Sequence, residues 1–186
     1  TFGESTSEKD GHEQIDLSID AGINFFDTAE MYPTCPLRPE TTGDTEVIIG
    51  IWIDKNRSKR SDIILATKIS GIGYEAVRSG EGINRDSIKV AIEGSLQKLK
   101  TDYVDLYQLH WPNRGSYHFR QNWNYNPSNQ DTKKANENIL EVLESLSEIK
   151  KEGKIRYIGL SNETCWGTIQ FLKYLKKFPN LKLVST

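Results

Sequence analysis

Short apolar runs alternate with amphipathic segments along the chain. Five runs rich in β-branched or aromatic residues have the length of buried strands, namely residues 24–28, 62–68, 103–111, 155–161 and 181–185. Apolar residues recur at helical spacing in the segments between them, and these predict helices over residues 8–21, 45–56, 84–99, 138–151 and 164–178. Asn84 is the predicted N-cap of the third helix, and Gly153 is placed to end the fourth.

This order is a helix, then a strand and a helix four times, then a last strand. Such alternation predicts an α/β fold in which helices cover a parallel sheet. Periodicity does not separate a closed barrel from an open doubly wound sheet. The strands are not followed by a Gly-x-Gly-x-x-Gly turn, which argues against a Rossmann dinucleotide site. A (β/α)8 barrel needs eight strands and about 250 residues, so the five strands visible here would leave it incomplete.

Residues 112–137 interrupt the regular spacing with a stretch rich in Asn, Gln and aromatic residues. A connection of this length without a pattern of its own is usually functional or disordered. Its aromatic side chains, Tyr117, Phe119, Trp123 and Tyr125, favour a binding loop over a purely flexible insertion.

Composition narrows the class of protein. A content of 36% hydrophobic and 27% charged residues is ordinary for a globular domain, and a net charge of −2 gives no basic surface for nucleic acid. Cys35 and Cys165 are too far apart in sequence for a zinc motif, and we expect free thiols and no metal site. We also expect no membrane span and a cytoplasmic location, with a targeting segment upstream of these residues left open.

Four polar residues lie where the strand patterns end or shortly beyond: Asp27, Tyr32, Lys68 and His110. The carboxyl ends of parallel strands share one edge, so these side chains can converge there. Taken singly, Asp27 could cap a turn, Tyr32 could be a surface aromatic and His110 could be a core histidine. Lys68 follows an apolar strand and would need a partner, for which Asp27 is the natural choice.

Together the four residues suit carbonyl reduction. Hydride arriving at a carbonyl carbon leaves negative charge on the oxygen, which then needs a proton donor and electrostatic stabilisation. Tyr32 could donate the proton, Lys68 could stabilise the resulting phenolate, Asp27 could hold the lysine, and His110 could orient the carbonyl. A Schiff-base lyase that uses Lys68 is a rival interpretation.

Four segments resemble those of the aldo-keto reductase family in the same order, namely residues 22–32, 65–68, 103–111 and 153–162. The resemblance implies that Asp27, Tyr32, Lys68 and His110 are catalytic and that Ser161 and Asn162 hold the nicotinamide carboxamide of NADP(H). Trp111, directly after His110, is the candidate substrate-binding residue. The implied reaction is NADPH-dependent reduction of an aldehyde or ketone.

The resemblance also implies that residues 1–186 form one domain, an incomplete (β/α)8 TIM barrel that lacks the first strand and the last two βα units. Residues 30–33, 38–41 and 161–164 resemble the bacterial Tas-like branch in particular. Potassium-channel β subunits are similar more distantly, which leaves a regulatory cofactor-sensing module as an alternative. We further predict self-association through the two exposed sheet edges, and we keep open that the 186-residue stretch is itself inactive.

Overall fold

The computed structural model describes residues 2–115 and 123–186, in which five α-helices alternate with five strands. The helices are α1 (Glu8–Asp20), α2 (Asp44–Lys55), α3 (Arg85–Leu99), α4 (Thr132–Lys151) and α5 (Cys165–Leu175). The strands are β1 (Phe25–Asp27), β2 (Ile64–Ile69), β3 (Val104–Leu109), β4 (Ile155–Leu160) and β5 (Leu183–Ser185). The predicted order of elements is therefore confirmed.

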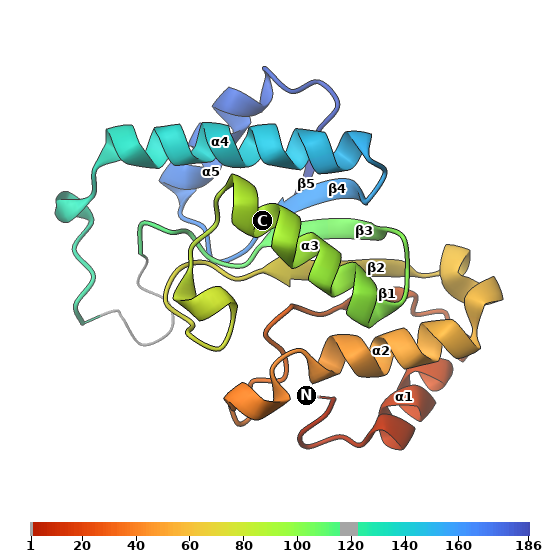
Figure 1. Cartoon of the computed structure of the whole chain (residues 1–186). Coiled ribbons are helices and arrows are strands. Elements are labelled where there is room, and N and C mark those ends of the chain that lie inside the picture. Colours follow the sequence, from red (N-terminus) through yellow and green to blue (C-terminus); the bar gives the residue numbers. More distant parts are fainter. Residues whose placement is uncertain (1, 116–122) are drawn as a thin grey trace.

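All five strands are parallel and lie side by side in chain order, β1-β2-β3-β4-β5 (Figure 1). Each strand pairs with the next through a helical crossover, which is the repeating unit of a (β/α)8 barrel. The α/β class is confirmed, and the sheet is consistent with part of such a barrel. β1 and β5 are the edges of the described sheet, as predicted. Contact of these edges with another chain stays a prediction.

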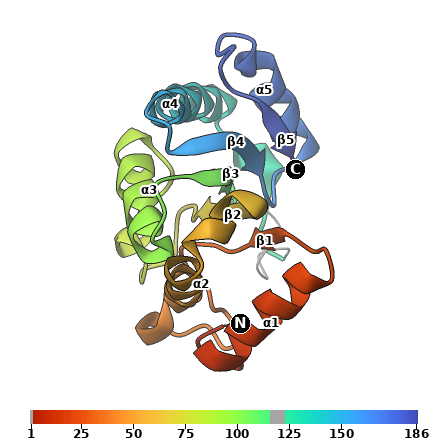
Figure 2. The same ribbon diagram turned by 90° about the vertical axis from the view of Figure 1, so that its right-hand side faces the viewer.

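The helices form an arc around one face of the curved sheet (Figure 2). Alternate strand residues such as Leu65, Tyr107 and Leu109 point toward this layer and join one core cluster with helix residues such as Leu143. The opposite, inner face carries the polar residues that lie next to the apolar ones in sequence. Strand periodicity thus separates the packed core from the face on which the candidate site lies.

Two helix boundaries show how well local signals were read. Asn84 caps α3 with a reciprocal capping box to Ser87, as predicted for an N-cap. The predicted start of the fourth helix at residue 138 is wrong, because α4 begins at Thr132 after Asp131, whose carboxylate accepts hydrogen bonds from two backbone amides. The first turns of α4 are polar and solvent-facing, so they lack the apolar period. The connection after β3 therefore ends at residue 131 and contains a short 3₁₀ helix, Pro127–Asn129.

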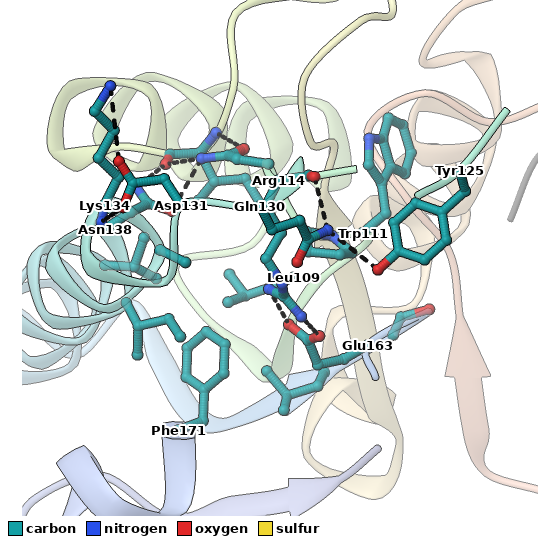
Figure 3. Close-up of a pocket in the computed structure, with 18 of the residues that line it drawn as sticks. Leu109, Trp111, Arg114, Tyr125, Gln130, Asp131, Lys134, Asn138, Glu163 and Phe171 are labelled. Carbon is teal, nitrogen blue, oxygen red and sulfur yellow. Dashed lines mark hydrogen bonds and ion pairs between the residues drawn. The ribbon is translucent and has the colours of Figure 1, made fainter. Parts of the chain in front are cut away.

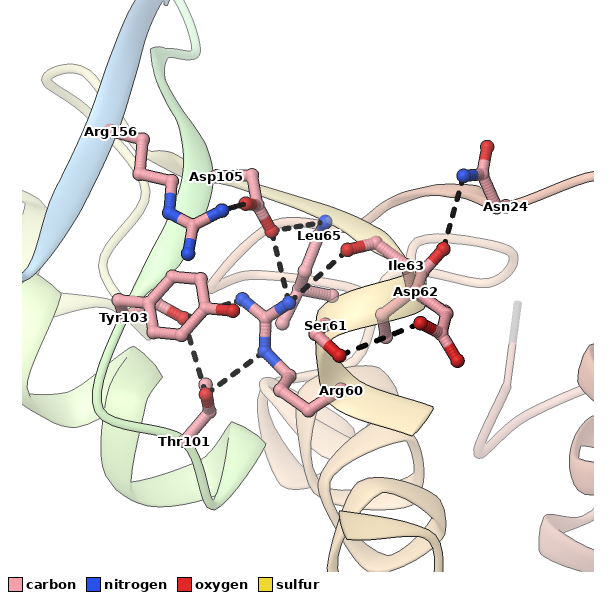
Figure 4. Close-up of polar contacts among 10 residues, drawn as sticks. All are labelled: Asn24, Arg60, Ser61, Asp62, Ile63, Leu65, Thr101, Tyr103, Asp105 and Arg156. Atoms are coloured by element: carbon pink, nitrogen blue, oxygen red, sulfur yellow. Dashed lines mark hydrogen bonds and ion pairs between the residues drawn. The ribbon is translucent and has the colours of Figure 1, made fainter. Parts of the chain in front are cut away.

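A buried ionic cluster fastens the amino-terminal ends of β2, β3 and β4 (Figure 4). Asp105 Oδ2 lies 3.0 Å from Arg60 NH1 and accepts the Leu65 amide at 3.0 Å, while its Oδ1 lies 2.9 Å from Arg156 NH1. Both guanidinium groups also lie over the Tyr103 ring, 4.0 and 4.1 Å from its centre. This cluster fixes the strands at the end of the sheet opposite the candidate site.

Within the described part of the chain, no helix combines the length and the apolar character needed to cross a bilayer.

Candidate active site

The structure brings Asp27, Tyr32, Lys68 and His110 together at the carboxyl ends of β1, β2 and β3. Lys68 Nζ lies 2.5 Å from Asp27 Oδ2 and donates to the Thr28 carbonyl oxygen at 2.9 Å. The same ammonium lies 4.9 Å from the centre of the Tyr32 ring. Tyr32 OH is 3.4 Å from His110 Nε2. The four side chains thus form one continuous set of polar contacts.

One detail of the expected placement is wrong. The second predicted strand stops at Lys68, but β2 continues to Ile69, so Lys68 lies inside the strand. Period-two alternation still directs its side chain to the inner face, opposite Thr67, which contacts α2 through Glu46. Lys68 is 5% exposed, and the partner expected for such a buried cation is Asp27.

Tyr32 is positioned by its backbone, because it belongs to no strand. Its carbonyl oxygen accepts hydrogen bonds from Gly43 N at 3.0 Å and from Thr45 N at 3.3 Å. These amides belong to the first turn of α2 and its N-cap, where backbone donors have no partner within the helix. The start of α2 therefore anchors the catalytic candidate that lies farthest from the sheet.

Glu30 fastens the segment between Asp27 and Tyr32 to the neighbouring loop. Its carboxylate accepts the Ser70 amide at 2.5 Å and pairs with Arg78, which also donates to the Ser70 carbonyl oxygen at 3.0 Å. Glu30 is buried, so this charge needs the partners that it has. The loop that carries Tyr32 is thereby held against the end of β2.

His110 is electrically neutral at physiological pH. Burial, and to a lesser extent the positive charge of Lys68, lowers the pKa of His110 from 6.5 to about 3. Its ring meets Tyr32 edge to face, with ring centres 5.5 Å apart and planes at 77°. A neutral imidazole beside the phenol can donate or accept one hydrogen bond at Nε2, depending on its tautomer.

Ser161 and Asn162 follow β4 directly and lie beside His110. Asn162 adopts a left-handed backbone conformation, with φ of 52°, and its amide nitrogen donates to the His110 carbonyl oxygen at 2.8 Å and to Ser161 Oγ at 3.1 Å. These bonds leave the Asn162 amide oxygen as an acceptor and the Ser161 hydroxyl hydrogen as a donor. A nicotinamide carboxamide offers the complementary pair, one NH2 group and one carbonyl oxygen, so the two residues fit it.

A pocket of about 860 Å³ adjoins this site beneath the loop after β3 (Figure 3). Of the predicted site residues, Trp111 and Ser161 line it, whereas the four catalytic candidates do not. Its apolar wall includes Leu109 and Phe171, which belong to the core between the sheet and the helices. The pocket is therefore a neighbour of the catalytic candidates and not the space directly around them.

The aromatic residues predicted to make a binding loop have mixed outcomes. Tyr125 lines the pocket, and its hydroxyl accepts a hydrogen bond from Gln130 at 3.1 Å. Trp123 is 89% exposed and points away from any core. Tyr117 and Phe119 lie outside the described residues. Trp111 packs against His110 with ring centres 4.9 Å apart and donates to the Ile72 carbonyl oxygen at 3.1 Å.

Gln108 was not selected from the sequence as a site residue, yet it contacts the site directly. Its amide nitrogen donates to Asp27 Oδ1 at 2.7 Å. The available signal was a polar residue in the middle of an apolar strand, two positions before His110 and so on the same face.

Comparison with known proteins agrees with this geometry. Residues 1–184 match the Aldo/keto reductase family. The chain belongs to the aldo/keto reductase family. It is 40% identical to protein Tas of Escherichia coli over an alignment that covers the whole chain and 53% of that protein. This similarity also confirms the resemblance to the Tas-like branch.

Other relatives carry oxidoreductase names. The chain is 34% identical to aldo-keto reductase YhdN of Bacillus subtilis, covering 87% of the chain and 40% of the relative. It is 30% identical to norsolorinic acid reductase B of Aspergillus parasiticus, covering 89% of the chain and 36% of that protein. The chain thus spans about half the length, or less, of these relatives. Family membership supports a carbonyl-reducing oxidoreductase in general terms.

Proposed function

We propose that the protein to which these residues belong reduces aldehyde or ketone carbonyls to alcohols with NADPH as the hydride donor. The observation that carries the proposal is the contact set of Asp27, Lys68, Tyr32 and His110 at one end of the sheet. It supplies a proton donor, a cation beside that donor and a neutral imidazole at hydrogen-bond range of the same hydroxyl. These are the groups that carbonyl reduction requires.

In the proposed reaction, a reduced nicotinamide, when bound, supplies the hydride to the carbonyl carbon. Tyr32 OH gives its proton to the carbonyl oxygen, so that one hydride and one proton complete the alcohol. The Lys68 ammonium then lies 4.9 Å from the centre of the ring that carries the phenolate and stabilises its negative charge. Asp27 holds that ammonium in place at 2.5 Å.

His110 is proposed to orient the substrate carbonyl. Because its pKa is lowered to about 3, the imidazole carries no positive charge that would compete with Tyr32 as the acid. Its Nε2 lies 3.4 Å from the Tyr32 oxygen, so a carbonyl oxygen between the two groups could contact both. Trp111, stacked against His110, is the proposed substrate-binding residue beside that position.

Ser161 and Asn162 are proposed to hold the nicotinamide carboxamide. Two hydrogen bonds fix the Asn162 amide before any ligand binds, which reduces the entropy lost on binding. Fixing the ring by its carboxamide would set which face of the nicotinamide meets the substrate.

The proposal is tested with the full-length parent enzyme, purified and mixed with NADPH or NADH and a panel of aldehydes and ketones. Carbonyl-dependent loss of absorbance at the nicotinamide band, faster with NADPH, is the expected result. Slow turnover with tightly retained cofactor would instead favour a regulatory module. Trapping of a carbonyl compound on Lys68 by borohydride would favour a Schiff-base lyase. Either of these outcomes overturns the proposal.

A further inference from the structure

Gln108 is a buried polar side chain in the middle of β3. It is 8% exposed and stands between Tyr107 and Leu109, both of which pack into the helix-side core. Its own side chain points to the inner face, where the catalytic candidates lie. A buried amide requires hydrogen-bond partners, and the partner here is a carboxylate two strands away.

The carboxylate of Asp27 is held from two neighbouring strands at once. Gln108 Nε2 donates to Oδ1 at 2.7 Å, and Lys68 Nζ donates to Oδ2 at 2.5 Å. Lys68 and Gln108 are paired in the register of β2 and β3, so their side chains leave the sheet side by side. Each oxygen of the carboxylate therefore has its own donor, which fixes both its position and the rotation about its last bond.

Asp27 needs this second donor because it is not enclosed. Its side chain is 44% exposed, whereas that of Lys68 is 6% exposed. A solvent-accessible carboxylate held by one ion pair can exchange that contact for water at little cost in free energy. Lys68 cannot follow it into water because β2 confines the ammonium, so loss of Asp27 would leave Lys68 with only the Thr28 carbonyl oxygen.

The next strand keeps Gln108 in this conformation. A Cβ atom at Gly159 of β4 would lie 2.9 Å from Gln108 Cγ, closer than side chains tolerate. The glycine thus leaves the space that the Gln108 side chain occupies beside β4, and the backbone there closes it on one side. The amide is directed toward Asp27 by packing as well as by its hydrogen bond.

We propose that Gln108 is a positioning residue that fixes Asp27 and, through it, the Lys68 ammonium beside Tyr32. The inference rests on the proposed function for its catalytic consequence, although the contact itself can be tested without catalysis. Gln108 touches neither the reacting carbonyl nor the hydride donor in this arrangement. Its effect is on the geometry of the cation that stabilises the phenolate.

The catalytic test compares variants of the full-length parent. Gln108→Leu removes the donor at similar volume, and we expect kcat to fall about 10- to 100-fold, the range for one hydrogen bond to a charged group, while KM for NADPH changes little. Gln97→Leu, on the exposed side of α3, is the matched control and should keep native kcat.

Gln108→Glu supplies a readout that a purely structural role would not move. At neutral pH the new carboxylate repels Asp27, whereas at low pH its protonated form can donate an O–H to the same oxygen. Activity relative to the native enzyme should therefore rise as the pH falls from 8 to about 5. A flat ratio across that range, or native kcat in Gln108→Leu, overturns the proposal.

A second measurement on the 186-residue chain separates failure of this inference from failure of the proposed function. Acetylation of Lys68 by acetic anhydride is followed by peptide mass spectrometry in the native chain, in Gln108→Leu and in Gln97→Leu. We expect Lys68 to be acetylated several-fold faster only in Gln108→Leu, with an unchanged far-UV circular dichroism spectrum. Equal rates in a folded Gln108→Leu chain contradict the positioning role. If that variant does not fold, the pH profile of Gln108→Glu decides.

Discussion

Acidification should destabilise the fold through His110. The folded chain holds this ring neutral, with its pKa lowered to about 3 mainly by burial, whereas in the unfolded chain it titrates near 6.5. Below about pH 6.5 the unfolded state therefore takes up a proton that the folded state does not. The free energy of unfolding must fall as the pH is lowered through the window from about 6.5 to about 3.

The magnitude follows from the two pKa values. Each pH unit inside the window changes the free energy of unfolding by about 1.4 kcal/mol, because one proton separates the two states. At pH 5, about 1.5 units below the unfolded value, His110 alone should account for a loss of about 2 kcal/mol relative to pH 7. Other titrating groups add their own contributions, so the His110 share must be obtained by difference.

The assay is urea unfolding of the native chain and of His110→Gln at pH 7 and pH 5, followed by circular dichroism. The variant keeps a polar side chain that does not titrate in this range. The pH-dependent loss should be about 2 kcal/mol smaller in His110→Gln than in the native chain. An identical loss in both proteins would show that the folded chain accommodates the imidazolium and would refute the neutral ring assigned to the site.

Two other predictions concern the frame and the cofactor. Asp105→Ala leaves buried Arg60 without its carboxylate and should lower the free energy of unfolding by about 3–5 kcal/mol, while the exposed Asp102→Ala should change it little. The 186-residue chain should bind NADPH more weakly than micromolar in a fluorescence titration, because the family resemblance places the nicotinamide-stacking aromatic and the 2′-phosphate grip in later βα units. Micromolar or tighter binding would mean that Ser161, Asn162 and their neighbours contribute more than we assign to them.

The sequence predicted the fold well wherever burial imposed a period. β3 and β4 are apolar on the helix-facing side, and α3 carries its own capping signal at Asn84, so both types of element could be located from local residues. The start of α4 could not, because its first turns face solvent and are stabilised by Asp131 capping instead of by packing. Element existence followed from burial, and boundaries depended on hydrogen bonds that the apolar pattern does not record.

The candidate site shows the same division. Asp27, Lys68 and His110 could be grouped because strand ends converge in any parallel sheet. The contact of Gln108 with Asp27 could not be predicted, since it depends on the register of three strands and on the space beside Gly159. Fold rules place residues at an edge, whereas the actual partners depend on side-chain packing.

The assignment of Tyr32 as the proton donor is the central claim, and one substitution tests it most directly. Tyr32→Phe in the full-length parent removes the hydroxyl that lies 3.4 Å from His110 Nε2 but keeps the ring beneath Lys68. We predict that kcat for carbonyl reduction falls by about 10²–10⁴-fold while the Kd for NADPH changes little, and that Tyr174→Phe on α5 has no such effect. Near-native turnover by Tyr32→Phe would contradict the account.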